Sequence, residues 1–224
     1  TMTYDKFTIL RSTCVPLPIE NVDTDQIIPA RFLKATERKG FGDNLFRDWR
    51  FNIDGSLKKD FVLNNPTFKG KILVGGKNFG SGSSREHAAW SIYDYGFRCV
   101  ISSFFADIFR ANCLNIGVLP VQISENFLNI LFENIYDNPN IQLLIDLPKQ
   151  LVTIPSLQLS ERFVINEYKK NNMLNGFDDI DYLVNIKKSI IDFSKYLILN
   201  VLSSIIKLSN NCLFCFVISI FTSK

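Results

Sequence analysis

The chain has 224 residues, of which 46% are hydrophobic and 21% charged, an ordinary composition for a globular protein with one substantial core. Its formal net charge of +3 is small, and no cluster of lysines and arginines alternates with aromatic residues, which argues against a nucleic-acid-binding surface. The five cysteines are scattered and odd in number, a pattern typical of reduced thiols in a cytoplasm. Residues 1–6 carry no apolar core of a secretory signal peptide.

The N-terminal part begins with a strand-like stretch and continues as irregular chain. Residues 7–15 (FTILRSTCV) predict one strand, which the prolines after it would end. Residues 21–29 then place two carboxylates, Asp23 and Asp25, ahead of an apolar pair. An Asx-type turn alone would explain both carboxylates.

Residues 31–50 are charged, aromatic and glycine-bearing, which predicts a long connecting loop with a short helical turn at residues 30–33. Residues 51–70 contain polar turns and an Asn-Asn-Pro break. These breaks return the chain to a second predicted strand at residues 71–74 (KILV).

The most informative stretch is the octapeptide at residues 80–87 (GSGSSREH). Its glycines permit an unusual backbone path, and Ser83 and Ser84 are good helix N-cap residues, so we expect a strand-to-helix turn. A helix is expected from Arg85 up to Gly96, which would close it. Two hydroxyls and a guanidinium beside free backbone N–H groups would suit a carboxylate or phosphate ligand. A capped helix with an incidental surface arginine would explain the same residues.

The rest of the chain alternates between strand-like and helix-like segments. In chain order we expect a strand at 98–102, a helix at 104–114, a strand at 118–121, a helix at 124–136, a hairpin of strands 141–147 and 150–155, a further strand at 162–165, a helix at 167–174, and a last helical segment beginning at 178–183 and reaching about residue 196. Mixed strands and helices in this order imply one α/β domain.

Residues 197–224 differ from the rest, because they are apolar and almost free of charge. Their two apolar runs, 197–206 and 212–221, are each about half of the roughly 20 residues that a membrane span needs, so a membrane anchor is not the favoured reading. An exposed β-prone extension of this kind would favour aggregation. Cys212 and Cys215 have metal-like spacing, but no second Cys/His pair accompanies them, and no metal site is expected.

Several ordered motifs point to a known family. Residues 78–88 (NFGSGSSREHA) and 103–109 (SFFADIF) resemble the signature of the swivelling domain of the aconitase superfamily. Residues 21–29 and 40–51 are similar to segments of the bacterial 3-isopropylmalate dehydratase small subunits, and the similarity runs from about residue 7 to about residue 195. The resemblance implies a single α/β domain of the three-layer β/β/α swivelling type over residues 1–196, with 197–224 as an extension of uncertain status.

The resemblance also implies an activity. Enzymes of this family, also called isopropylmalate isomerases, are hydro-lyases of leucine biosynthesis that convert 2-isopropylmalate to 3-isopropylmalate by dehydration and rehydration. The small subunit is active only with a large subunit, on which a four-iron, four-sulfur cluster is expected. This chain has one histidine and no cysteine cluster, so it should bind no metal or cofactor itself. The expected partners are the large subunit and a small dicarboxylate, in the cytoplasm, without nucleic acid or membrane.

By residue-to-residue match, the resemblance assigns the catalytic base to Ser83. A serine alkoxide needs helix N–H groups and a neighbouring cation to stabilise it. Arg85 is that cation and would grip a substrate carboxylate with two hydrogen bonds, while Ser84 would donate another. Lys34 falls in the loop that selects the substrate's side chain in the family and is a candidate substrate contact, with a merely solvated lysine as the competing explanation.

Asp23, Asp25 and His87 are expected to support the site without contacting the substrate. His87 is the only histidine in the chain, and we expect it to fix the loop by hydrogen bonding, with proton transfer as the alternative. Two other functions stay open: a small subunit of a related hydro-lyase acting on another substituted malate or maleate, and a degenerate, non-catalytic subunit. The intact Ser83 and Arg85 argue against the second.

Overall fold

The computed structural model describes residues 4–33 and 40–221, with side chains described up to residue 204 except that of Lys188. The chain divides into two compact units, Thr1–Asp179 and Ile180–Lys224. Of the elements that the structure describes, the first unit carries both sheets and every helix except α7 (Asp179–Phe221), most of which belongs to the second unit.

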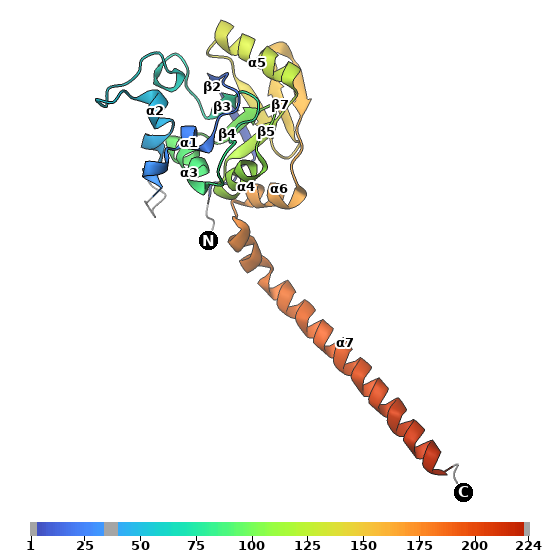
Figure 1. Ribbon diagram of the computed structural model, residues 1–224. Helices are drawn as coiled ribbons and strands as arrows, with labels where there is room; N and C mark the ends of the chain where they lie inside the picture. The colour runs from blue at the N-terminus through green and yellow to red at the C-terminus, as the bar shows by residue number, and fades with distance from the viewer. Residues whose placement is uncertain (1–3, 34–39, 222–224) are drawn as a thin grey trace. The chain divides into compact units, whose positions relative to one another are not determined.

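Two four-stranded sheets form the centre of the first unit (Figure 1). One is parallel, in the order β2 (Cys14–Leu17), β3 (Ile72–Gly75), β4 (Cys99–Ser102) and β5 (Leu119–Gln122). The other is antiparallel, in the order β1 (Ile9–Ser12), β6 (Leu143–Asp146), β7 (Leu151–Ile154) and β8 (Leu159–Arg162). Nearly every residue of the parallel strands is buried, as expected for a parallel sheet covered on both faces.

Four helices of the first unit have well-defined ends. They are α3 (Glu86–Tyr95), α4 (Asp107–Ile116), α5 (Glu125–Asp137) and α6 (Glu167–Asn175). The Ser124 side chain caps α5, and Gly96, Gly117 and Gly176 end α3, α4 and α6 in the left-handed conformation that favours glycine. The predicted helices are confirmed at these places, with boundaries that differ by a few residues.

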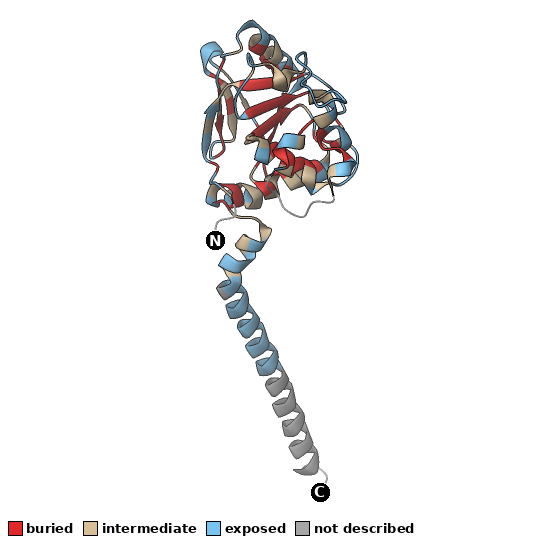
Figure 2. Ribbon diagram, turned by 90° about the vertical axis from the view of Figure 1, so that its left-hand side faces the viewer, coloured by how far each residue is buried: buried red, intermediate tan, exposed pale blue. Residues whose placement is uncertain are grey.

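Alternate residues of the parallel sheet face two separate cores. Ile72 and Val74 pack in the core that also holds Ile145 of the antiparallel sheet and the apolar face of α5. Leu73 packs in the other core, with Ala89 of α3 and with residues of α4. The parallel sheet is therefore the middle layer, which confirms the predicted three-layer β/β/α arrangement. Figure 2 shows the buried residues concentrated in the strands and on the inner sides of the helices.

The N-terminal strand differs from the prediction. Residues 7–15 do not form one strand, because the chain passes from β1 in the antiparallel sheet to β2 in the parallel sheet at Thr13. At this crossing Gly70, with φ of +140°, approaches Thr13 so closely that a Cβ would overlap the Thr13 carbonyl. The continuous strand-like sequence of residues 7–15 is therefore divided between two sheets. The alternation of apolar residues could not predict this, because it does not show which neighbouring strand each residue pairs with.

Two further boundaries are corrected. The helix predicted at 104–114 begins only at Asp107, because residues 104–106 pair with the chain before α3: Phe79 N donates to Phe104 O at 3.0 Å, and Ala106 N donates to Phe79 O at 3.2 Å. The strand predicted at 162–165 lies earlier, as β8. The short helix η4 (Pro155–Leu157) and Gln158, with φ of +50°, turn the chain back sooner than the pattern indicates.

The region before β3 is built from short helices. They are α1 (Thr24–Ile27), η1 (Ala30–Phe32), η2 (Gly42–Asn44), α2 (Arg47–Arg50) and η3 (Val62–Asn64). The turn η1 confirms the helical turn predicted at residues 30–33. Backbone Phe46 N donates to Ile27 O at 2.8 Å, so the start of α2 is tied to the end of α1.

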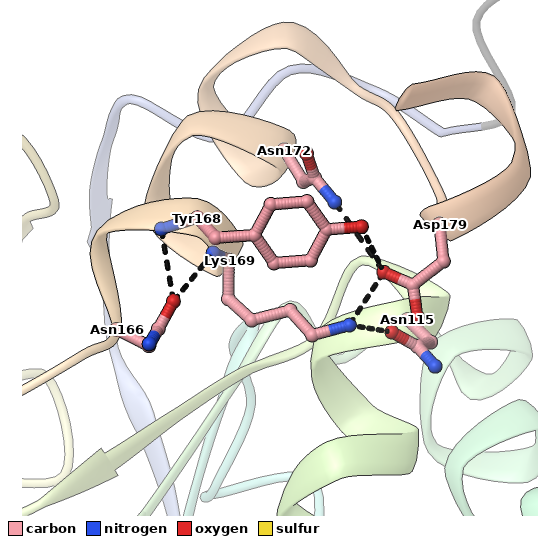
Figure 3. A network of polar contacts seen from close by, with 6 residues as sticks. All are labelled: Asn115, Asn166, Tyr168, Lys169, Asn172 and Asp179. Carbon is pink, nitrogen blue, oxygen red and sulfur yellow. Dashed lines mark hydrogen bonds and ion pairs between the residues drawn. The ribbon is translucent and has the colours of Figure 1, made fainter. Parts of the chain in front are cut away.

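A network of polar contacts lies between α4, α6 and the start of α7 (Figure 3). Lys169 Nζ donates to Asn115 Oδ1 and to Asp179 Oδ1, both at 2.6 Å, and Tyr168 Oη donates to the same Asp179 oxygen at 2.8 Å. Partial burial favours the neutral acid, but these hydrogen bonds outweigh it and lower the pKa of Asp179. The network therefore joins α4, α6 and the first residue of α7 through one carboxylate.

The described part of the second unit, residues 180–221, is helical. The last helix was predicted to end near residue 196, but α7 continues to Phe221 and includes residues expected to be β-prone. The run contains no glycine or proline that would interrupt a helix. In the part of the chain that the structure describes, no helix is both long and apolar enough to cross a membrane.

Candidate functional site

The octapeptide lies at the carboxyl end of β3, where the chain turns into α3. Gly80 and Gly82 have φ of +79° and +90°, a conformation that costs other residues energy. A Cβ at Gly80 would overlap the Phe109 ring of α4, and one at Gly82 would overlap the Asp23 carboxylate. Both glycines are thus required by close approach as well as by backbone conformation.

The α1 segment holds the loop along its length. Gly80 N and Ser81 N both donate to Val22 O, at 2.8 and 3.0 Å, and Thr24 N donates to Ser81 O at 2.8 Å. The Thr24 hydroxyl, itself buried, donates to the Ser83 carbonyl at 2.9 Å. These contacts join residues almost 60 positions apart, and they fix the backbone on which the two site serines stand.

Asp23 is the N-cap of α1. Its carboxylate accepts from Asp25 N at 2.6 Å, and Gln26 Oε1 accepts from Asp23 N at 2.8 Å, so the two residues form a capping box. The turn explanation of Asp23 therefore holds locally. The same carboxylate lies against Gly82, so it also limits the path of the loop that carries Ser83.

Asp25 and Arg85 form an ion pair across the two segments. The Arg85 side chain is 17% exposed and that of Asp25 49%, so the guanidinium is held mostly inside the protein while the carboxylate faces partly outward. Asp25 thus orients the cation that the sequence singled out. Arg85 is also the N-cap of α3 and makes no capping hydrogen bond with its side chain.

Ser83 and Ser84 are exposed and precede that N-cap position. The expectation that they cap the helix is wrong, because the hydrogen bond from Thr24 to the Ser83 carbonyl draws the chain toward α1 before the helix starts. Among the described residues, neither serine hydroxyl makes a hydrogen bond. Both hydroxyls stay available to a ligand at the N-terminus of α3, where the helix dipole favours negative charge.

His87 lies in the first turn of α3 and packs against two rings. The centroid distances are 5.4 Å to Phe41 and 4.5 Å to Trp90. Within the described ranges its imidazole makes no hydrogen bond, so the expected hydrogen bonding to the loop is not seen, and His87 instead packs α3 against Phe41. Lys34, the candidate substrate contact, lies outside the described residues.

Sequence reasoning missed two supports of the site. Thr24, which lies between Asp23 and Asp25 in the sequence, donates a hydrogen bond to the Ser83 carbonyl. Phe109, three residues into α4, fills the space beneath Gly80 and packs with Phe79 at a centroid distance of 5.5 Å. A glycine in a motif signals that something lies close to it, but the pattern does not say which residue.

The described residues do not bring together three His, Cys, Asp or Glu side chains in a way that could hold a metal ion. Cys14, Cys99 and Cys113 are buried, and burial raises the pKa of each thiol. Neutral, enclosed thiols are poor ligands for iron, since the thiolate is the ligand form. The donor set of the described chain therefore does not fit an iron–sulfur cluster.

Comparison with known proteins assigns this chain to a family. Residues 4–126 match the family model of the aconitase C-terminal domain, more than half of the chain. The chain thus belongs to the aconitase C-terminal domain family, as its sequence motifs indicated.

Its relatives narrow the assignment. The 3-isopropylmalate dehydratase small subunit of Cytophaga hutchinsonii is 60% identical over 191 residues, which cover 85% of this chain and 95% of that protein. The same subunit of Karelsulcia muelleri is 53% identical over 196 residues, covering 88% and 100%. A crystal structure of 3-isopropylmalate dehydratase from Methanocaldococcus jannaschii aligns with a TM-score of 0.58 at 25% identity, covering 84% of this chain and 99% of that one. Within its family, the chain is one of the 3-isopropylmalate dehydratase small subunits.

Proposed function

We propose that this chain is the small subunit of an isopropylmalate isomerase, a hydro-lyase of leucine biosynthesis that converts 2-isopropylmalate to 3-isopropylmalate by dehydration and rehydration. The observation that carries the proposal is the arrangement at the start of α3, where two exposed serine hydroxyls stand beside the inward-held Arg85. Relatives that are 46–60% identical over most of the chain carry the name of this subunit. The site therefore has the residues for a dicarboxylate substrate.

Ser83 is the proposed general base. In the dehydration its oxygen takes the proton from the carbon beside a substrate carboxylate, and in the rehydration it returns a proton to the other carbon. Such a proton is weakly acidic, so the base must be strong and its negative charge must be stabilised before the substrate arrives. The N-terminus of α3 and the Arg85 guanidinium are the groups that supply this stabilisation.

Arg85 is the proposed carboxylate anchor. Its guanidinium has five N–H donors, and the ion pair with Asp25 uses only Nη1. The remaining donors can form a two-pronged contact with a substrate carboxylate. Asp25 then acts as a positioning residue, because it holds the guanidinium in place without blocking that contact. Ser84 is proposed to donate to the substrate, and Lys34 to contact its side chain.

The Lewis acid of the reaction is proposed to lie on the large subunit. A four-iron, four-sulfur cluster there would polarise the substrate's hydroxyl group for its departure as water. The buried, separate thiols of Cys14, Cys99 and Cys113 support that division of labour. Enclosed, reduced thiols also support a cytoplasmic location.

An anaerobic assay tests the proposal. The chain is assayed alone and mixed with a cluster-loaded 3-isopropylmalate dehydratase large subunit, and the ultraviolet absorbance of 2-isopropylmaleate is followed. Activity only in the mixture is the expected result. A folded, partner-bound chain without activity on isopropylmalate would contradict it, and methyl-substituted malate in the same assay would then distinguish a related hydro-lyase from an inactive subunit.

A further inference from the structure

A tight hairpin at residues 51–57 projects from the first unit between α2 and β3 (Figure 1). Phe51 and Leu57 pair as an antiparallel bridge, and Asn52 N donates to Ser56 O at 2.8 Å. Asn52 Nδ2 also donates to Ser56 Oγ at 2.9 Å, and Asp54 Oδ1 accepts from Ser56 N at 2.9 Å. Backbone and side-chain bonds together hold the hairpin in one shape without help from a partner.

The tip of this hairpin presents a large aliphatic side chain. Ile53 has 110% of its reference surface exposed, more than any other large hydrophobic residue described. A single exposed isoleucine is ordinary on a protein surface. Ile53 differs because it stands on a preorganised turn and lines a cleft of 690 Å³, while Asn52 and Leu57 of the same hairpin line a second cleft of 550 Å³. Because the turn is already held by these bonds, the cost of ordering its backbone is small if the Ile53 side chain enters a partner.

The larger cleft is positively charged. Three cations line it, Arg31, Arg47 and Lys58, against a single carboxylate. That carboxylate, Asp48, is already paired with Arg31, and the pairing lowers the pKa of Asp48. The Arg47 guanidinium lies 3.8 Å from the centre of the Phe51 ring, at the base of the hairpin. The cleft thus carries more positive than negative charge, next to the Phe51 ring. This charge is complementary to acidic side chains of a partner.

The cleft is connected to the 80–87 loop through α1 and α2. Asp25, which pairs with Arg85, lies two residues before Ile27, whose carbonyl is bonded to Phe46 N. Arg47 and Asp48 follow directly. A stable interface covers about 800 Å² on each partner, a patch with a radius on the order of 16 Å. A partner of that size that reaches Ser83 would extend beyond the loop, and the surface of α2 is tied to the loop through α1.

We propose that the 51–57 hairpin and the adjoining cleft, lined by Arg31, Arg47 and Lys58, form the docking surface for the large subunit. Ile53 enters an apolar pocket of that subunit, and the cleft faces its acidic side chains. This inference rests on the proposed function, since it takes the large subunit as the partner.

Binding of the full-length chain to the large subunit tests the apolar part. The dissociation constant is measured for the wild type, for Ile53→Asp and for the control Val164→Asp, which alters an exposed aliphatic residue (73% exposed) beyond β8. Ile53→Asp is expected to weaken binding by roughly 30-fold or more, the loss typical of a central anchor residue. Val164→Asp should change it by less than about 3-fold, well below that anchor loss. Equal losses in both variants would overturn the proposal. Ile53→Ser, with circular dichroism as the folding check, guards against a misfolded variant.

The charged part has its own readout. Arg47→Glu is expected to slow association and to flatten its dependence on salt, because long-range attraction acts mainly on the association rate. Lys149→Glu, a substitution of an exposed cation beside β6, serves as the matched control and should leave the salt dependence unchanged. An unaltered salt dependence in Arg47→Glu would overturn this part.

Failure of the two proposals can be told apart. If the wild-type chain neither binds the large subunit nor gives activity with it, the proposed function fails. If the wild type binds and is active while the Ile53 variants bind equally well, only the docking surface is wrong. Sedimentation of the chain alone tests whether the hairpin instead binds a second copy of this chain. If the wild type self-associates and Ile53→Asp does not, while both bind the large subunit equally well, the hairpin is a self-association surface and the inference is overturned.

Discussion

Ser83 and Arg85 are held in different ways, and the difference matches the roles proposed for them. Ser83 is exposed, and its one contact among the described hydrogen bonds is made by its carbonyl, which accepts from the Thr24 hydroxyl. The Arg85 guanidinium is largely buried against Asp25. A base that must reach a substrate needs access, whereas an anchor must have a fixed direction before the substrate binds.

Ser83→Ala should lower turnover of the two-subunit enzyme by roughly 10²- to 10⁴-fold, because it removes the proposed base from an exposed position. Thermal unfolding and binding to the large subunit should stay unchanged. Ser84→Ala is the matched control and should raise KM more than it lowers kcat. Steady-state kinetics decide the matter, and full turnover in Ser83→Ala would remove Ser83 from the mechanism.

Arg85→Lys should raise KM by roughly 10- to 100-fold, since the two-pronged contact with a carboxylate is replaced by a point charge. Asp25→Asn should act in the same direction but less strongly, because it leaves the guanidinium present and only loosens its orientation. If Asp25→Asn lowered thermal stability without changing KM, its role would be structural alone.

Single elements show how the loop keeps its shape. The loop runs between α1 and α4, and its two glycines lie where these elements approach it most closely. Gly55, in the 51–57 hairpin, also has a positive φ, of +83°, but a Cβ there would meet nothing within 4 Å. A substitution at Gly55 would therefore cause backbone strain alone, whereas one at Gly80 or Gly82 would cause both backbone strain and steric overlap.

Gly80→Ala should destabilise the protein more than Gly55→Ala does. Both substitutions carry the left-handed strain of about 1–2 kcal/mol, but only the first also displaces the Phe109 ring, which adds on the order of 1 kcal/mol or more. Urea unfolding of both variants measures the difference. Equal losses of unfolding free energy in the two variants would mean that the Phe109 ring of α4 moves aside without a measurable cost in stability.

The network at Asp179 predicts a pH dependence of stability. The folded-state pKa of Asp179 is lowered from its ordinary value of 3.8, so the stabilisation is present above that value and is lost as pH falls through the lower, folded-state pKa. Asp179→Asn should therefore reduce stability at pH 7 and flatten the acid branch of the stability curve. The exposed Asp60→Asn serves as control. An unchanged acid branch in Asp179→Asn would show that the carboxylate adds nothing measurable.

At the scale of the whole molecule, the first unit carries the sheets and every described residue of the site. The relatives are themselves covered to 95–100% by matches over 191 and 196 residues, so these matches leave 12–15% of this chain without a counterpart. The described middle part of α7 carries many exposed apolar side chains, among them Ile190, Phe193, Leu197, Ile198, Leu199, Val201 and Leu202. A surface of this kind promotes association.

Removing residues 197–224 should leave activity with the large subunit unchanged and should raise solubility, because it deletes exposed apolar surface and no described residue of the site. Removal from residue 177 onward is the contrasting truncation, and it should lower thermal stability because it also deletes Asp179. Loss of activity in the shorter deletion would place a functional role on the extension.

Local signals identified much of this protein in advance. Glycines after helices, a serine before α5 and apolar runs of strand length located most elements within a few residues, because capping and periodicity act between near neighbours. For these elements the sequence alone was sufficient. Ser83, Ser84 and Arg85 lie together before α3, as their spacing requires, but the roles that the family resemblance assigns to them stay predictions.

Contacts between distant residues were decided only by the tertiary structure. The division of residues 7–15 between two sheets, the ion pair of Asp25 with Arg85 and the support of the Ser83 carbonyl by Thr24 each join segments that the pattern leaves independent. Periodicity states that a residue is buried, but the partner that buries it depends on how all the elements pack together.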